Sequence, residues 1–234
     1  MVSQEPIESV SRAGGVPGGQ HNLSAQEQAG AALAQAQLQA MQLQDSLAHN
    51  ASVKEIQGGV EKMHAPIEAL NAAAPQMMPN EAYLIQNASD QHQQMAAHIA
   101  EINPAQVAQL QGTLQTIDQV QAHPYGAKMD IAHIDALNAT NQLAALSDQL
   151  QVQLSSNNPS SSHVHDLING MKEPAQKLDD LAKSDKMNAS ETEQIQVVVT
   201  MTTETISVPD ASTPGAVTGV QESVETLNDV LMPS

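Results

Sequence analysis

The residues best suited to chemistry in this sequence are histidines and carboxylates, and one short string gathers three of them. His163, His165 and Asp166 stand in the string HVHD, and imidazole and carboxylate groups are ordinary zinc ligands. Two histidines two residues apart share one side only in an extended chain, because on a helix they point about 200° apart. The string begins a predicted helix, so we expect two half-exposed histidines here and no metal site.

General acid–base pairs can also be assembled from residues on other predicted helices: Asp90, His92, His98, Glu101, His133 and Asp135. Any helical chain of this length supplies such residues, and nothing singles out a nucleophile or an oxyanion hole. His92 lies on an apolar helix seam, where we interpret it as a hydrogen-bonded packing residue, with a pH-sensitive packing residue as the alternative.

Motifs that carry enzyme chemistry are missing from the sequence. It has no G-x-S-x-G, no Walker-type loop and no H-E-x-x-H. The chain contains no Cys, which excludes a thiolate nucleophile, a disulfide and a cysteine-bound zinc ion. We therefore expect a protein that is not an enzyme, with no catalytic residue, bound cofactor, metal or small-molecule substrate.

The charge of the chain restricts its partners. The net charge is −18, from 26 acidic and 8 basic residues, and Arg12 is the only arginine. Because phosphates are bound by Lys and Arg, this composition argues against nucleic acid and against an anionic membrane surface as partners. A basic protein partner is compatible with it.

The predicted location follows from the absence of targeting signals. No stretch reaches the ~18–20 apolar residues of a membrane span, and the N-terminal residues lack the apolar core of a signal peptide. We expect a cytoplasmic protein without direct membrane insertion, which includes a place at the inner face of a membrane complex. The alternative is export by a route that needs no classical signal.

The elements that would position all these residues are long amphipathic helices. Apolar residues recur at helical spacing over 25–49, from 53, over 81–102, from 104, and over about 128–155, 163–183 and 214–231. Ser24 with Glu27, and Ser52 with Glu55, form predicted capping boxes. The fold class is predicted to be all-α: an antiparallel bundle of about six to seven helices with one C-terminal extended segment.

The domain organisation is predicted from changes in composition along the chain. Residues 1–22 are interpreted as a disordered tail, 23–184 as the helical bundle, and 185–234 as a C-terminal segment. There is no Phe and no Trp, so the core must use Leu, Ile, Val, Met and Ala.

An internal similarity indicates a duplication. IQGGVEKMHAPIEAL at 56–70 aligns without a gap with VHDLINGMKEPAQKL at 164–178, which places Pro66 on Pro174. A duplicated helical hairpin is one explanation. The other is chance, because short helical sequences rich in Ala and Leu match easily.

One stretch differs from the helical pattern. Residues 194–208, QIQVVVTMTTETISV, alternate and are rich in β-branched residues. A lone strand leaves its backbone donors and acceptors unpaired, so four outcomes stay open: a hairpin, a helix, disorder, or addition to a sheet of another chain. The last is favoured, and it predicts the following partner-binding residues in this segment and the terminal helix: Ile195, Val197, Val199, Met201, Ile206, Val208, Leu227 and Leu231.

The function predicted from these features is protein–protein binding. We expect a non-enzymatic structural or adaptor subunit of a larger multiprotein assembly, and the acidic, Cys-free, Ala/Gln-rich style is typical of accessory components of bacterial secretion machines. The alternatives are a protein exported by a specialised secretion system, as a filament or tip component or an effector, and a phage structural protein.

Overall fold

The computed structural model describes residues 24–49, 51–123, 126–207 and 214–232, so the tail predicted for residues 1–22 and the candidate Val208 lie outside it. Within these ranges the protein is all-α. The helices are α1 (Ala25–Ala48), α2 (Val53–Ala73), α3 (Pro79–Ala97), α4 (Pro104–Ala122), α5 (Ile131–Ser155), α6 (Ser161–Gly170), α7 (Lys172–Ala182), α8 (Ala189–Ser207) and α9 (Pro214–Leu231), with short 3-10 turns η1 (Ala74–Gln76), η2 (Ile99–Glu101) and η3 (Gly126–Lys128).

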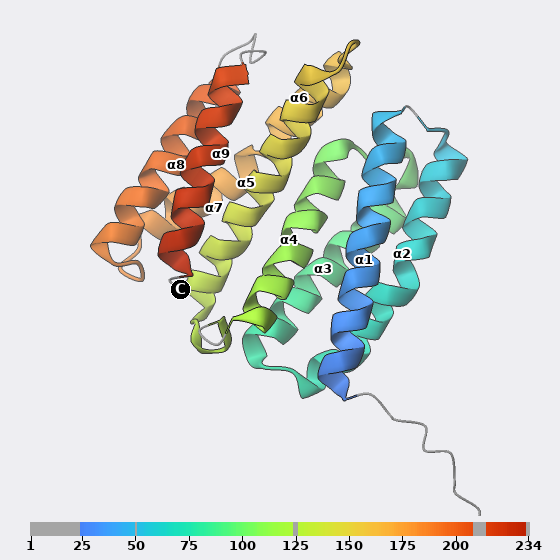
Figure 1. Cartoon of the computed structure of the whole chain (residues 1–234), viewed down its shortest axis with the longest axis horizontal. Coiled ribbons are helices and arrows are strands. Elements are labelled where there is room, and N and C mark those ends of the chain that lie inside the picture. The colour runs from blue at the N-terminus through green and yellow to red at the C-terminus, as the bar shows by residue number, and fades with distance from the viewer. Residues whose placement is uncertain (1–23, 50, 124–125, 208–213, 233–234) are drawn as a thin grey trace, which may run out of the picture.

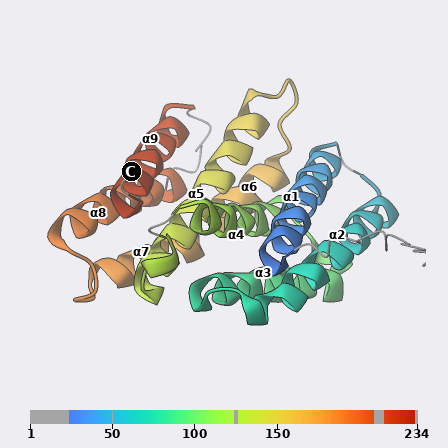
Figure 2. The ribbon, with the colours of Figure 1, turned by 60° about the horizontal axis from the view of Figure 1, so that its bottom comes forward.

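The first four helices form one closed unit. Along the chain, α1 packs on α2, α2 on α3 and α3 on α4, and α4 returns to pack on α1. Figure 2 shows these four helices around a common centre. This is the arrangement of a four-helix bundle, in which each helix buries one stripe against two neighbours.

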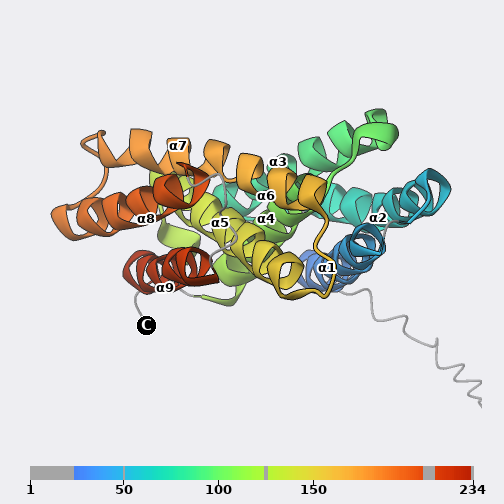
Figure 3. The ribbon, with the colours of Figure 1, turned by 90° about the horizontal axis from the view of Figure 1, so that it is seen from above.

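The remaining helices form a second closed unit of the same kind. The helix α5 packs on α6 and α7, α7 on α8 and α8 on α9, and α9 returns to α5. Only Met171 separates α6 from α7, so together they run for the length of one long helix and occupy one place in the unit. Figure 3 shows this unit beside the first, with α5 and α6 near the middle of the molecule.

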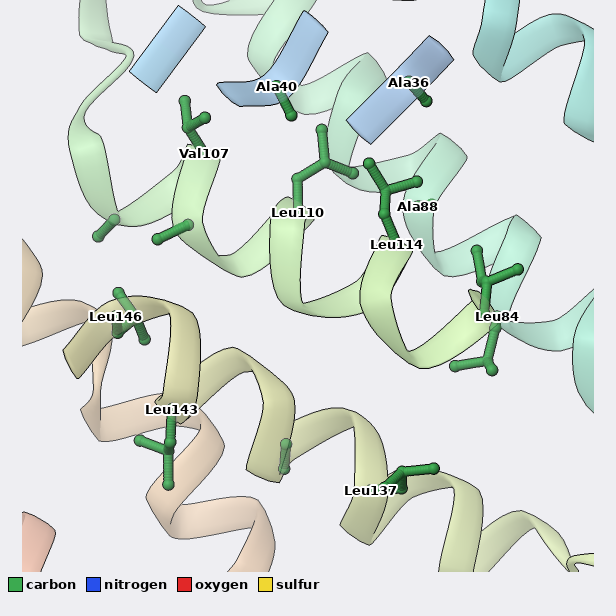
Figure 4. Packing of buried hydrophobic residues seen from close by; sticks show 14 of the residues in the cluster. Ala36, Ala40, Leu84, Ala88, Val107, Leu110, Leu114, Leu137, Leu143 and Leu146 are labelled. Carbon is green, nitrogen blue, oxygen red and sulfur yellow. The ribbon is translucent and has the colours of Figure 1, made fainter. Parts of the chain in front are cut away.

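The two units meet where α4 packs on α5 and α6. Figure 1 shows α4 between α1 and α5, with α8 and α9 on the other side of α5. In Figure 4, Val107, Leu110 and Leu114 of α4 point toward α1, whereas Leu143 of α5 points away from α4. The leucines therefore fill the interiors of the two units, and small and polar residues are left for the joint between them.

The helix starts follow the local sequence. Both predicted capping boxes are confirmed, since Ser24 accepts the backbone N–H of Glu27 and Ser52 accepts that of Glu55, while each glutamate reaches back to its serine. These pairs satisfy backbone donors that a helix start leaves free. The helix predicted over 81–102 begins two residues earlier, because α3 starts at Pro79 and Glu81 accepts the backbone N–H of Met78.

The predicted extended segment was wrong, because α8 is helical over Ala189–Ser207 and no strand occurs in the described parts of the chain. Its buried residues follow helical spacing, at Ile195, Val198, Thr202 and Thr205. Packing on α7 and α9 outweighs the strand preference of β-branched residues, which is weak beside burial. The backbone groups that a strand would offer to a partner are used inside the helix.

The predicted helix count was too low for the same reason. Nine α-helices occur in the described residues instead of six to seven, because residues 194–207 lie in a helix and the helix predicted at 163–183 is divided at Met171. The second helix, α2, continues through Pro66, which is buried inside it.

Candidate functional site

The partner-binding residues predicted from the sequence are scattered by the helical geometry. Ile195, Leu227 and Leu231 are buried in the core of the second unit, and Val199 and Ile206 are half-buried against it. Val197 and Met201, one turn apart on α8, are 39% and 38% exposed. Only these two of the described candidates present apolar surface to a partner.

The most connected histidine joins two helix starts. The Nδ1 atom of His133 lies 2.8 Å from Asp130, and its Nε2 atom lies 3.3 Å from the buried carboxylate of Glu191 on α8. Burial lowers the pKa of His133, but hydrogen bonding and the charges of Asp130 and Glu191 outweigh burial, so the pKa is raised. Glu191 also accepts the backbone N–H of Asn188. These contacts hold the start of α5 to the start of α8.

A neighbouring carboxylate connects the two units. Asp135 of α5 accepts a hydrogen bond from the hydroxyl of Tyr83 on α3 and another from Lys177 on α7, both at 2.8 Å. The other candidates for acid–base chemistry are apart from this cluster: His98 lies 3.9 Å from Glu101 at an exposed position, and Asp90 accepts a bond from Gln86. His133 and Asp135 therefore contact residues that are distant in the sequence, and not the other candidates for acid–base chemistry.

The HVHD string begins α6 and is helical, with Ser160 as the N-cap. His163 and His165 therefore cannot chelate one ion from one side of an extended chain. Within the described ranges, no group of three or more His, Asp or Glu residues is placed to hold a metal ion.

His92 is a packing residue, as one of the two alternatives predicted. It is buried on α3, and its Nε2 atom lies 3.1 Å from the backbone carbonyl of Val60 on α2. A carbonyl only accepts, so Nε2 carries the proton. The ring stacks on His64 with centroids 5.9 Å apart. Burial lowers the pKa of His92, the bond to Val60 opposes this, and the charge of His64 adds to the lowering.

One surface hollow has a mostly polar lining and is explained by helix ends. It is about 580 Å³ and lies between the end of α1 and the start of α2. Its acidic lining residues are engaged locally: Glu55 accepts the backbone N–H of Ser52, and Asp45 pairs with His49 at 3.3 Å. The arrangement stabilises the turn between two helices.

A second hollow lies on the face shared by both units. It is a groove of about 390 Å³ lined by residues of α1, α4 and α5. Figure 1 shows that α4 lies between the other two helices. The lining residues are mostly amides, namely Gln37 and Met41 of α1, Gln111 and Gln115 of α4, and Ala145, Asp148 and Gln149 of α5.

Large apolar side chains border this groove. Met41 is 62% exposed, Leu38 lies one turn before it on α1 and is 48% exposed, and Val152 lies three residues beyond Gln149 on α5 and is 57% exposed. Ala31 and Ala34 extend the apolar stripe of α1 toward its start and are exposed. We call the exposed stripe Ala31, Ala34, Leu38 and Met41, together with the groove and Val152, the uncharged face.

The name reflects the lack of charge in the helices that form this surface. Residues 28–44 of α1, 104–117 of α4 and 136–147 of α5 contain no Asp, Glu, Lys or Arg, in a chain of net charge −18. The one charged residue that lines the groove, Asp148, accepts a hydrogen bond of 2.7 Å from Gln221 of α9. Depletion of charge, with methionine present, is typical of the centre of protein–protein interfaces.

Sequence reasoning missed the uncharged face. The signal was present, because residues 31, 34, 38 and 41 repeat at spacings of three and four on the side of the helix opposite the buried residues Leu33, Ala36, Ala40 and Leu43. A helix with two apolar stripes and a 17-residue stretch without charge needs burial on two sides. The second stripe was overlooked because only one stripe was assigned to this helix.

The described helices include none long and apolar enough to cross a membrane. Comparison with known proteins adds no relative: no family model, no curated protein and no solved structure matches the chain.

Proposed function

We propose that this protein is a non-enzymatic scaffold or adaptor that binds another polypeptide through the uncharged face. The observation that carries the proposal is the position of Leu38, Met41 and Val152 around one groove whose lining contains a single charged residue, Asp148. Exposed apolar groups gathered on one surface, in a protein whose remaining surface is acidic, mark an interaction site.

The chemistry of the groove defines what it binds. Gln37, Gln111, Gln115 and Gln149 each offer an amide that both donates and accepts. Three helices with apolar rims provide a trough that fits one further helix, laid with its apolar side inward. A helix with uncharged polar residues is the expected occupant, because a charged one would lose its solvation without gaining an opposite charge.

Membership of a larger assembly follows from this role. A scaffold built of two units joined side by side offers a long rigid surface, and that suits a structural subunit. The association with a secretion machine, with export or with a phage particle stays a prediction from sequence style, and location in the cytoplasm stays a prediction as well.

We also infer that the two four-helix units are copies of one ancestral unit. The helix lengths correspond in order: 24, 21, 19 and 19 residues in α1 to α4, and 25 residues in α5, 10 and 11 in α6 and α7, 19 in α8 and 18 in α9. The aligned prolines Pro66 and Pro174 are both buried in equivalent helices.

Residues outside the segment aligned from the sequence extend the correspondence. Pro104 begins α4 and Pro214 begins α9, and 110 residues also separate the buried pairs Val107 and Val217, Leu110 and Val220, Leu114 and Val224, and Ile117 and Leu227. The same spacing relates Glu81 of α3 to Glu191 of α8. Both glutamates are buried, and each accepts the backbone N–H three residues earlier at 2.8 Å. The matching burial of these two glutamates supports a common origin of the two units over chance similarity of Ala- and Leu-rich helices.

The proposed function is tested by comparing two matched double variants in affinity purification from the source organism. Leu38→Glu with Met41→Glu places charge on the uncharged face, and Val197→Glu with Met201→Glu does the same on α8. All four side chains are exposed, so both proteins should fold, which circular dichroism checks. We expect the first variant to lose a defined set of co-purifying proteins that the wild type and the second variant retain.

Other results have distinct meanings. If only the α8 variant loses partners, binding occurs at the residues predicted from the sequence, and the uncharged face does not take part in it. If both variants recover the same proteins as the wild type, the proposal that exposed apolar surface binds partners is contradicted.

A further inference from the structure

The stripe of α1 corresponds to a surface that is covered elsewhere in the molecule. QLQ at 42–44 of α1 aligns with QLQ at 149–151 of α5, a spacing of 107 residues that also relates the core residues Leu43 and Leu150. With this spacing, Ala31 and Ala34 correspond to Asn138 and Asn141, and Leu38 corresponds to Ala145. The asparagines of α5 are buried, whereas their counterparts on α1 are exposed.

The helix α4 covers this surface of α5. Asn141 donates to Thr116 at 3.0 Å and to Gln119 at 2.8 Å, and Thr116 donates to Asn138. Gly112 allows the two backbones to approach closely at this point. The helices follow one another through a short connection and run in opposite directions, as Figure 1 shows. At the joint between the two units, α4 therefore covers α5 as an antiparallel helix. The surface of α5 that it covers corresponds to the exposed stripe of α1.

From these correspondences we propose that α1 of a second copy of this chain covers the stripe, so that two copies form a dimer about a two-fold axis perpendicular to α1. This rests on the proposed function, because it names the occupant of the uncharged face. A two-fold axis in this direction places the second α1 antiparallel to the first, which is the orientation of α4 on α5. A two-fold axis at the middle of the stripe places Leu38 of one copy near Ala34 of the other, and Met41 near Ala31, so that large side chains meet small ones.

The lack of charged residues on the uncharged face favours another uncharged surface, such as the same face of a second copy, over a charged partner. Each chain carries a net charge of −18, so two copies repel over most of their surface. The uncharged face is the region of α1, α4 and α5 with the fewest acidic groups, and Asp148 is the one charged residue in the lining of its groove. The stripe ends at Glu27 and Asp45, which limit the contact to the 17 residues between them.

The size of the face is close to what a dimer needs. Seventeen helical residues extend about 25 Å at 1.5 Å per residue, and three adjacent helices are about 25 Å wide. The face therefore covers on the order of 600 Å², somewhat less than the roughly 800 Å² per partner of a standard interface. A dimer of moderate affinity is expected, with exchange between one and two copies over accessible protein concentrations.

A head-to-tail arrangement is disfavoured by α9. In such an array α9 would cover α1 of the next copy, as α4 covers α5. The spacing of 110 residues makes Glu222 of α9 the counterpart of Gly112 on α4. At Gly112 the docked helix α5 leaves no room for a β-carbon, so a glutamate at the equivalent place would prevent the same docking. Glu222, Glu225 and Asp229 are exposed on this side of α9, so α9 ends the array and does not extend it.

Sedimentation velocity of the full-length chain over a range of concentrations tests the dimer. We expect a concentration-dependent shift from one copy to two, which becomes stronger from about 0.02 M to about 0.5 M NaCl because salt screens the repulsion between acidic chains. Leu38→Glu with Met41→Glu should abolish the shift, and Leu38→Ala with Met41→Ala should weaken it at least tenfold. Val197→Glu with Met201→Glu on α8 should leave it unchanged.

A cross-link tests the two-fold geometry. The chain contains no cysteine, so Gln35→Cys introduces a single thiol at an exposed position near the middle of the stripe. We expect this variant to form a disulfide-linked dimer on mild oxidation, whereas Thr200→Cys, at an exposed position on α8, should stay monomeric. A head-to-tail contact would cross-link neither variant to itself.

The outcomes separate this inference from the proposed function. A wild-type chain that stays monomeric at every concentration overturns the dimer, and the proposed function still stands if Leu38→Glu with Met41→Glu loses partners in affinity purification. A dimer that survives both double variants on α1 overturns the location of the contact. If the Gln35→Cys chain does not cross-link although the dimer forms, the two-fold arrangement is wrong.

Discussion

Gly112 on α4 lies against the backbone of Gln142 on α5 without room for a side chain. A β-carbon at residue 112 would be 2.6 Å from both the nitrogen and the α-carbon of Gln142. Backbone atoms of a packed helix do not move as the end of a flexible side chain does. The distance between α4 and α5, and so the joint between the two units, depends on this glycine.

Gly112→Ala should therefore lower the free energy of unfolding by about 1–3 kcal/mol, the usual effect of overpacking. Gly58→Ala on α2 is the matched control, because no atom lies within 4 Å of the added β-carbon. That variant should be more stable than the wild type by about 0.4–1 kcal/mol, since alanine restricts the unfolded chain. Urea denaturation of both variants measures the difference, and equal effects would contradict the close packing of α4 on α5.

Asn141 should be a second determinant of the joint. Its amide donates to Thr116 and Gln119 of α4, and its oxygen accepts a bond of 3.1 Å from Asn228 of α9. Asn141→Ala removes the donor to Thr116 and Gln119 and the acceptor for Asn228 in a buried place, so a loss of about 2–4 kcal/mol is expected. Asn71→Ala is the control, since its amide donates to Ser89 at 2.7 Å within the first unit. Denaturation followed by circular dichroism should show a smaller loss for the control, and the reverse order would contradict the role of Asn141.

The stability contributed by His92 should depend on pH. Burial and the neighbouring His64 keep its folded pKa below the ordinary value of 6.5, so the unfolded chain binds a proton more readily than the folded one. The contribution is full above pH 6.5 and decreases as the pH falls below it. His92→Gln, whose amide can still donate to Val60, should show a flatter decrease in unfolding free energy between pH 8 and pH 5.5 than the wild type. Parallel decreases would exclude His92 as the titrating group.

His133 should show the opposite dependence. Asp130 and Glu191 raise its folded pKa above 6.5 against the effect of burial, so the folded state binds the proton more readily. Its contribution is full below pH 6.5 and disappears as the pH rises through the raised folded value. His133→Gln should therefore be more destabilising at pH 6 than at pH 9, as measured by urea denaturation at both values. A loss of equal size at the two values would mean that the neutral ring, and not its charge, holds α5 to α8.

The extent to which the sequence predicted this fold depended on the kind of signal. Helix starts at Ser24 and Ser52 were predicted correctly because capping needs only residues within one turn. The closure of two separate units and the contact of Gly112 with Gln142 are long-range features, and no local pattern reports them. The uncharged face was missed because its residues come from three helices whose order in space is not readable from spacing.

The segment 194–208 shows how far burial can override local preference, and it permits a direct test. Thr200 and Thr203 are exposed on α8, and their hydroxyls bond the backbone carbonyls of Gln196 and Val199 four residues earlier. In a helix, alanine is preferred to threonine, so Thr200→Ala with Thr203→Ala should raise the unfolding free energy by about 1 kcal/mol. In a strand, the same change would lower it, because β-branched residues favour strands.

Ile195→Ala provides the control for folding of the segment. Ile195 is fully buried, so its truncation should cost about 2–5 kcal/mol if α8 is packed as described. Stabilisation by the threonine changes together with this loss would establish a packed helix. Destabilisation by the threonine changes would restore the extended segment predicted from the sequence, and with it the docking of residues 194–208 on the sheet of another chain. No effect from either change would show that the segment is not packed on the second unit at all.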